Sequence, residues 1–378
     1  MDKGVARRVA DKLMAKRREF GLSQAQVAEK IGCTREYISM IESGKRMPNL
    51  MILKKLAELY NVDIQWLLGE ESSTNVFSML LRAAPIDKAD RKRLEEFVKR
   101  CEDYAWLEKI LAVRKREAPE YKCTTPSFRP EMSLQAKKVA SDERKRLGLG
   151  DDPISDIFNL LENQGLHIIR IPLPNSRIDG AFAYDPEKGA FALINADRTK
   201  GKQVFTAAHE YCHFIKDRSS GYHPCETGEG HSPPHQRDLE RFADLFATHF
   251  LMPEEGVRNI VESNFNPSQI GVEDVIYLKR YFGVSYKAML IRLKELGYIK
   301  QTQFDRMEKV SVERIERTLY GESEEREEQA PKIPPLLAIL ALEAYSRRLI
   351  SLDRLAEIWR ISSSEAYEIL KSAGYEVD

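Results

Sequence analysis

The chain has 378 residues, 42% hydrophobic and 31% charged, and its 59 basic side chains balance 59 acidic ones. This length predicts two or three domains, and the neutral charge excludes a polycation that coats nucleic acid with its whole surface. There is no apolar run of about 18 residues and no amino-terminal apolar segment, so we expect a cytoplasmic protein without a membrane span. Five scattered cysteines agree with a reducing compartment rather than with a disulfide framework.

Residues 1–70 show apolar side chains at helical spacing and predict a domain of five short helices. Ser23 is placed to cap a helix that begins at Gln24, and Thr34 to cap a second helix that ends at Gly44. Two short helices joined by a glycine-containing turn are the helix-turn-helix arrangement. Residues 1–48 contain 11 basic and 6 acidic side chains, which gives this segment a local positive charge.

The segment LSQAQVAEKIGCTREYISMIESGK and the residues after it resemble the Xre, or lambda-repressor-like, family of DNA-binding domains. The resemblance implies binding to double-stranded DNA through two kinds of contact. Gln24 and Lys45 would contact phosphates, and the residues facing bases would be Thr34, Arg35, Glu36 and Ser39. The alternative is a module for protein interaction or dimerisation, and a homodimer is compatible with either role.

The remaining chain predicts an α+β, mostly helical protein. Residues 71–131 are expected to form a helical linker, residues 132–310 a mixed domain with a helical extension, and residues 331–378 a small helical, helix-turn-helix-like domain. Short β-rich runs at 167–173, 181–184 and 190–195 predict a small sheet. Helices are expected at 205–216 and 239–252, separated by a loop rich in Gly, Ser, Pro and His. The acidic stretch 313–328 is expected to be a solvated linker.

His209-Glu210-Tyr211-Cys212-His213 is an H-E-x-x-H motif, which places two imidazoles on one face of a helix. Glu210 is the candidate general base, because it lies beside them and can take a proton from a metal-activated water. A catalytic zinc site needs a third protein ligand, and Glu240 on the next predicted helix is the best candidate. Asp244, one turn later, would accept the outer N–H of a ligating histidine. The competing third ligands are His223, His231, His235 and His249.

The Glu240–Asp244 spacing resembles the thermolysin-like, or gluzincin, arrangement. The segments AAHEYCHFI, ERFADLFATHFLMP and FGVSYKAMLIRLKELG resemble the ImmA/IrrE family of bacterial metallopeptidases, from about residue 135 to 297. The resemblance implies His209, His213 and Glu240 as ligands of Zn²⁺, with Mn²⁺ as the alternative ion, and Glu210 as general base. The His-rich loop 217–238 with Cys225 departs from the family pattern. It is expected to be a shielding loop, with a second metal site or a thiolate plug as alternatives.

Three functions follow from these motifs. The first is a DNA-binding, zinc-dependent endopeptidase that cleaves a cytoplasmic helix-turn-helix repressor or similar regulatory protein, as members of the resembled family do in phage, mobile-element or stress regulons. The second is a non-enzymatic Xre-type repressor or antitoxin whose metal fold senses a ligand or binds a partner. The third is a hydrolase of a non-peptide substrate. An intact Glu210 favours an enzyme, because a binding module does not need an acid/base residue.

Overall fold

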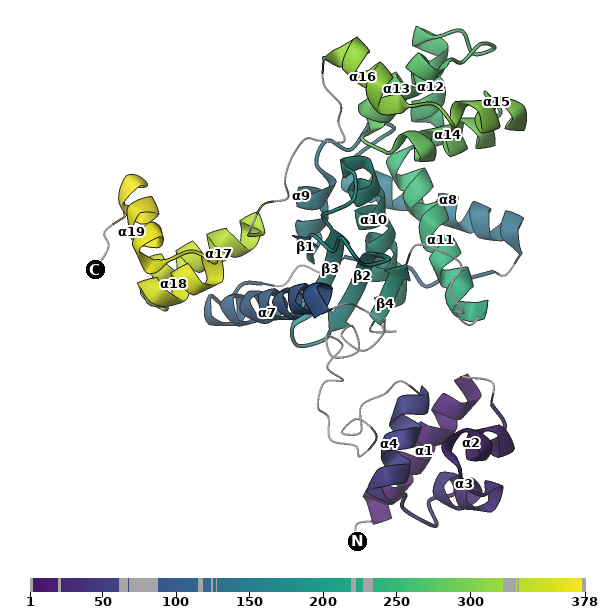
Figure 1. Cartoon of the computed structure of the whole chain (residues 1–378), viewed down its shortest axis with the longest axis vertical. Coiled ribbons are helices and arrows are strands. Elements are labelled where there is room, and N and C mark those ends of the chain that lie inside the picture. The colour runs from purple at the N-terminus through teal and green to yellow at the C-terminus, as the bar shows by residue number, and fades with distance from the viewer. Residues whose placement is uncertain are drawn as a thin grey trace. The chain divides into compact units, whose positions relative to one another are not determined.

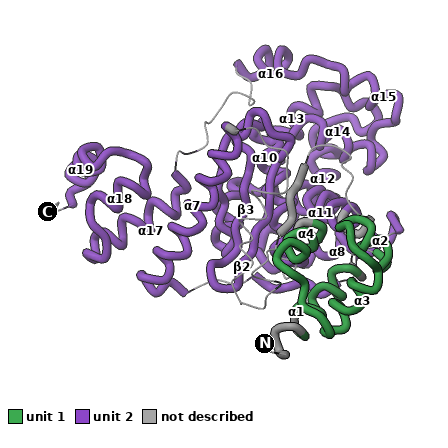
Figure 2. The backbone as a smooth tube through the Cα atoms, turned by 60° about the horizontal axis from the view of Figure 1, so that its bottom comes forward, with its two compact units in different colours: residues 1–84 green, residues 85–378 purple. Residues whose placement is uncertain are grey.

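The structure is a computed structural model that divides into two compact units, residues 1–84 and residues 85–378 (Figure 2). It describes residues 3–19, 22–60, 67, 88–114, 118–123, 125–126, 128–218, 222–226, 234–321, 331 and 333–375. The division falls within the expected linker 71–131. The other expected boundaries, at 131, 310 and 331, stay predictions. No helix in the described ranges has the length and apolar character needed to cross a bilayer.

The first unit contains four described helices: α1 (Lys3–Glu19), α2 (Gln24–Ile31), α3 (Arg35–Glu42) and α4 (Leu50–Tyr60) (Figure 1). The Ser23 and Thr34 hydroxyls accept backbone N–H groups at the starts of α2 and α3, as the sequence predicted. Gly32 ends α2 with a φ of 73°, a left-handed conformation that favours glycine. The apolar faces of the four helices meet in one core. The sequence predicted five helices within residues 1–70, and of residues 61–70 the structure describes only Leu67, so the fifth helix stays a prediction.

The second unit is built on a sheet of four described strands: β1 (Leu166–Ile171), β2 (Ile178–Asp185), β3 (Gly189–Asn195) and β4 (Tyr222–Glu226). The strand order is β1-β3-β2-β4, with β1 parallel to β3 and with β2 antiparallel to both of its neighbours. The sheet and the many helices confirm the predicted α+β, mostly helical class.

Strand β4 corrects the prediction that residues 217–238 form only a loop. The segment lacks the alternation of apolar and polar residues that marks a half-buried strand, so no strand is predicted there from the residues alone. Its pairing rests on backbone hydrogen bonds with β2, and Pro224 is tolerated because β4 lies at the edge of the sheet.

Helices cover both faces of the sheet (Figure 1). On one face, α10 (Lys200–Cys212) packs on β2 and β3, with α9 (Ile157–Glu162), α11 (Pro234–Leu251) and α8 (Arg129–Leu147) around it. On the other face lies α7 (Lys88–Ile110). His167 of β1 stacks on Tyr104 of α7, whereas Leu166 and Ile168 join the core shared with α10. Because successive strand residues point to opposite faces, α7 and α10 sandwich the sheet.

A helical layer follows the sheet: α12 (Glu254–Asn264), α13 (Val272–Phe282), α14 (Tyr286–Glu295), α15 (Gln301–Met307) and α16 (Val312–Tyr320). The start of α10 is pressed against this layer, since a Cβ at Gly201 would come within 2.4 Å of the Ser285 backbone nitrogen. Helix α16 corrects the expectation of a solvated linker from residue 313. Its Glu316 is fully buried and forms ion pairs with Lys279 and Arg280, which anchors the helix on α13.

The carboxyl-terminal helices are α17 (Pro335–Ser346), α18 (Leu352–Trp359) and α19 (Ser363–Ser372). They dock on α7: the Tyr104 hydroxyl accepts the Leu337 backbone N–H at 3.2 Å, and Arg354 contacts Asp103 at 2.7 Å. Helix α7 is therefore a shared layer between the sheet and the carboxyl-terminal helices rather than an isolated linker.

Candidate metal centre

Three side chains from two helices form the candidate metal centre. His209 lies on α10, and His213 is the first residue of a π-helical turn (His213–Asp217) that continues α10. Glu240 comes from the neighbouring helix α11. Within the described part of the chain, these are the residues whose ligand atoms group closely enough to hold a metal ion, all within 4.8 Å of one another. Both histidines are buried, and the Glu240 side chain is 26% exposed, which leaves this side of the centre open.

The distances between ligand atoms fit a small ion. His209 Nε2 lies 3.2 Å from His213 Nε2 and 3.2 Å from Glu240 Oε2, and His213 Nε2 lies 3.6 Å from Glu240 Oε1. Zinc binds nitrogen and oxygen at about 2.0–2.2 Å, so two ligands in a tetrahedral site lie roughly 3.3–3.6 Å apart. The observed spacing is close to that range, so the donor set fits Zn²⁺.

Each histidine is oriented by a carboxylate on its outer nitrogen. His209 Nδ1 lies 2.9 Å from Asp244 Oδ1, where the sequence had placed the partner. His213 Nδ1 lies 3.4 Å from Asp217 Oδ2, a partner that sequence reasoning missed. The signal was present, because Asp217 follows His213 at the same four-residue interval that separates Asp244 from Glu240. Such contacts fix which ring nitrogen faces the metal.

The electrostatics of the centre favour a cation. Burial alone would lower the pKa of His209, but Asp244 and Glu240 raise it well above its ordinary value. Burial would likewise raise the pKa of Asp217, but the contacts with His213 and with the Lys216 ammonium lower it, so Asp217 stays ionised. A divalent ion would supply the positive charge that these carboxylates attract.

Glu210, the candidate general base, is fully buried against strand β2. A Cβ added to Gly180 of β2 would lie 2.5 Å from Glu210 Oε1 and 2.4 Å from Thr206 Cγ2. Only a glycine therefore leaves room for the Glu210 carboxylate at this point of the strand. Sequence reasoning did not single out Gly180, although an isolated glycine inside a strand marks a close approach.

Tyr211, which lies inside the H-E-x-x-H motif, anchors α10 to α8. The Tyr211 hydroxyl donates to the buried carboxylate of Glu143 on α8, which also accepts from Tyr121 at 2.9 Å and from Arg146 at 2.6 Å. Burial tends to raise the pKa of Glu143, but Arg146 and the two tyrosines outweigh it and lower the pKa. The ionised network fixes the rotation of α10 about its axis and so the direction in which His209 and His213 point.

The competing histidines do not join the described centre. His249 lies on α11 away from the cluster, and burial lowers its pKa to about 4. The side chains of His223, His231 and His235, and that of Cys225, lie outside the described residues. A role for the His-rich segment in metal binding therefore stays a prediction.

The predicted DNA-contacting residues lie on or next to α2 and α3 of the first unit. Arg35, Glu36, Ser39 and Lys45 are exposed. Thr34 is exposed too, with its hydroxyl engaged in capping α3. Gln24 is half-buried, and its amide donates to Glu42 Oε2 at 2.9 Å, which orients it at the start of α2. The sequence did not single out Glu42, which also binds Arg17 at 2.7 Å and ties α1, α2 and α3 together.

Fold and site thus define a helix-turn-helix module joined to a domain of the metallopeptidase type. Residues 13–67 match a family model described as helix-turn-helix, and residues 161–294 match the peptidase model described as IrrE N-terminal-like domain. The chain therefore carries an amino-terminal Xre-like helix-turn-helix domain and an ImmA/IrrE-like peptidase domain.

Relatives of the first module are all short in comparison with this chain. An uncharacterized HTH-type transcriptional regulator, YgzD of Bacillus subtilis, is 32% identical over 63 residues, 16% of this chain and 96% of the relative. The HTH-type transcriptional regulator SinR of Bacillus licheniformis is 26% identical over 98 residues, 24% of this chain and 88% of the relative. The ImmF control region 10 kDa protein of Bacillus phage phi105 is 39% identical over 49 residues, 13% of this chain and 54% of the relative.

Proposed function

We propose that this protein is a DNA-binding, zinc-dependent endopeptidase that cleaves a helix-turn-helix repressor or another cytoplasmic regulatory protein. The observation that carries the proposal is the convergence of His209, His213 and Glu240, with Glu210 buried on the same helix as His209. A site that only bound a metal would not need a buried carboxylate beside its ligands, because an ionised group there costs free energy.

His209, His213 and Glu240 would hold the ion, with Asp244 and Asp217 orienting the rings. Zinc supplies Lewis acidity, which polarises the scissile carbonyl and makes a water molecule acidic. Glu210 accepts the proton of that water on a carboxylate oxygen and passes it to the leaving amine. The wall of β2 at Gly180 keeps Glu210 in position for both transfers. Mn²⁺ would be compatible with the same donors.

Residues 1–70 would bring the peptidase to DNA where its substrate is bound. Arg35 of α3 would read guanine in the major groove, whereas Lys45 would contact a phosphate. Linking a DNA contact to a substrate contact raises the local substrate concentration without a new catalytic group. Residues 217–238, between the two helices that carry the ligands, are the expected gate that keeps the cleft from cutting any extended chain.

The test compares the full chain with Glu210→Gln and with Glu255→Gln, an exposed carboxylate of α12 that serves as the matched control. Each protein, purified without added metal, is analysed for metal and incubated with candidate repressors and with casein. We expect one zinc per chain in all three and single-site repressor cleavage by the wild type and the control, with little casein degradation. Glu210→Gln should lose cleavage but keep DNA binding.

Three results would each contradict a part of this proposal. If cells that carry Glu210→Gln regulate the same genes as the wild type, a non-enzymatic Xre-type regulator becomes the better explanation. If Glu240→Ala keeps full metal content, a histidine of the 217–238 segment is the third ligand. Vigorous degradation of casein would reject the gate.

A further inference from the structure

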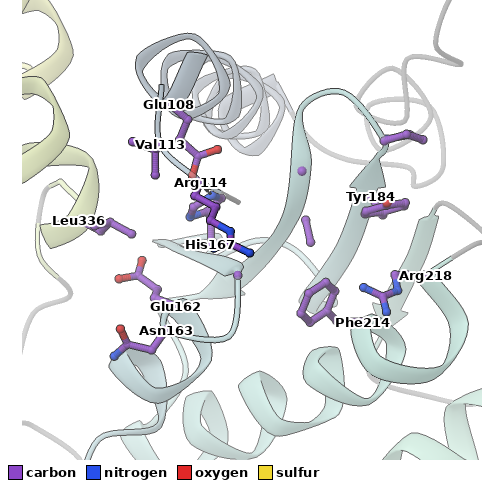
Figure 3. A pocket seen from close by; sticks show the side chains of 14 residues that line it. Glu108, Val113, Arg114, Glu162, Asn163, His167, Tyr184, Phe214, Arg218 and Leu336 are labelled. Carbon is purple, nitrogen blue, oxygen red and sulfur yellow. Dashed lines mark ion pairs between the residues drawn. The ribbon is translucent and has the colours of Figure 1, made fainter. Parts of the chain in front are cut away.

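A pocket lies in the unit formed by residues 85–378, and none of the three candidate metal ligands lines it (Figure 3). It is a cavity of about 240 Å³ at the end of the sheet where β1 begins and where β2 turns into β3. Its walls also include the end of α7, the π-helical turn after α10 and the start of α17. Helices α7 and α17 lie outside both ranges matched by the family models, whereas the strands and the π-helical turn that line the pocket lie within the range 161–294.

His167 contributes the most informative polar group of the pocket. Its side chain is 7% exposed and lines the pocket, and its Nε2 lies 2.9 Å from Glu108 Oε1. A neutral ring that donates its Nε2–H to Glu108 keeps a lone pair on Nδ1. No group among the described residues hydrogen-bonds to that buried Nδ1. A buried acceptor without a partner costs about 1–3 kcal/mol, so a ligand that donates an N–H here would be favoured.

The charged side chains of the pocket are of both signs. Glu108 and Glu162 provide carboxylates around His167, and Figure 3 shows Glu162 across the pocket from Arg218. Burial raises the pKa of Glu162, and a bound ammonium group would offset that cost. The Arg218 guanidinium is held by the Ala118 carbonyl at 2.8 Å and by the Phe214 ring, and its other N–H groups can donate to an acid.

The size and the charge pattern select the class of ligand. Pockets for drug-sized molecules occupy roughly 300–1,000 Å³, so this smaller cavity suits a smaller metabolite. The ligand needs a cationic nitrogen for Glu162, an acidic group for Arg218 and a short apolar part beside Phe214 and Tyr184. We propose that this pocket binds a free amino acid, with its ammonium group at Glu162 and His167 and its carboxylate at Arg218.

The pocket shares a wall with the metal centre. Phe214 directly follows the ligand His213, and Arg218 directly follows Asp217, which orients His213. An amino acid in the pocket would therefore contact and brace the π-helical turn at Phe214 and Arg218. Bracing this turn reduces local opening of residues 213–218.

The binding test uses the full chain and needs no proteolysis, so it can fail independently of the proposed peptidase activity. Thermal unfolding is followed with each proteinogenic L-amino acid in turn, with inorganic phosphate and adenine as separate probes, and calorimetry gives the affinity. We expect at least one amino acid to raise the Tm. Glu162→Gln and His167→Phe should weaken its binding by at least about tenfold, whereas Glu187→Gln, an exposed carboxylate outside the pocket, should not.

Amide hydrogen exchange of the wild type gives a readout that does not depend on whether the variants fold. The bound amino acid should slow exchange at residues 213–218 relative to the free protein. The proposal is overturned if no amino acid binds, or if only phosphate or adenine binds. It is equally overturned if an amino acid binds without slowing exchange in this turn, because its site is then elsewhere.

Discussion

Replacement of Gly180 by alanine tests how closely Glu210 packs against the sheet. The new Cβ would lie 2.4 Å from Thr206 Cγ2, 2.5 Å from Glu210 Oε1 and 3.0 Å from the Leu193 carbonyl oxygen. The first two atoms end side chains, whereas the third belongs to the backbone of the paired strand β3. The Glu210 carboxylate should therefore move, while the sheet stays in place.

Overpacking of this kind costs about 1–3 kcal/mol, which lowers the Tm of a unit this large by several degrees. Metal content should stay that of the wild type, because His209, His213 and Glu240 do not contact the new methyl group. Cleavage should fall towards the level of Glu210→Gln, since general-base catalysis contributes about 10²–10⁴-fold.

Thermal unfolding, metal analysis and repressor cleavage measure the three effects on one preparation. Adding Thr206→Ser to Gly180→Ala removes one of the two clashing side-chain atoms. The double variant should regain part of the lost Tm but not the cleavage, because the contact with Glu210 remains. A Gly180→Ala protein with the Tm and the cleavage rate of the wild type would refute the argument that Glu210 depends on a glycine here.

Three further predictions concern other parts of the chain. Asp244→Asn and Asp217→Asn should each weaken zinc affinity by roughly 10–100-fold in a chelator competition, whereas loss only in Asp244→Asn would remove Asp217 from the site. In a fragment of residues 1–70, Arg35→Ala should relax the preference for one DNA sequence. Lys45→Ala should weaken binding to every duplex and lower the slope of log affinity against log salt concentration by about one. A fragment without DNA affinity at low salt would favour a protein-interaction module. Burial lowers the pKa of His249 to about 4, so the unfolded chain takes up its proton first as the pH falls. Stability should therefore decline from about pH 6.5 to about pH 4, by up to roughly 3 kcal/mol, and His249→Asn should reduce that slope in urea titrations; an equal slope in both proteins would contradict it.

The sequence predicted the parts of the fold that have strong local signals. The caps Ser23 and Thr34 and the buried apolar strands β1 and β3 carry such signals in their own side chains. Strand β4 has none, because its pairing depends on the β2 backbone beside it. Helix α16 was mistaken for a linker because Glu316 looks solvated in sequence, and only its ion pairs with Lys279 and Arg280 explain its burial.

In the candidate site, too, the residues that can be predicted are those with a local sequence signal. A four-residue interval appears three times in it: between His209 and His213, between His213 and Asp217, and between Glu240 and Asp244. On a helix this interval places two side chains on one face, so ligands and their carboxylate partners can be found by counting. The position of Asp217 was missed because the expected helix ended at residue 216, whereas the structure continues α10 through a π-helical turn.

The position of Glu210 cannot be found by counting residues along a helix. Its motif names it as a base, but its position depends on Gly180, thirty residues earlier on a strand that the helix crosses. The strand must pass within contact distance of the helix for the carboxylate to be buried, and only the tertiary arrangement determines that. The residues that would bind the ion thus lie on two neighbouring helices, whereas the position of the residue that would move the proton depends on the sheet. A variant that loosens α10 from β2 should consequently impair catalysis before it releases the metal.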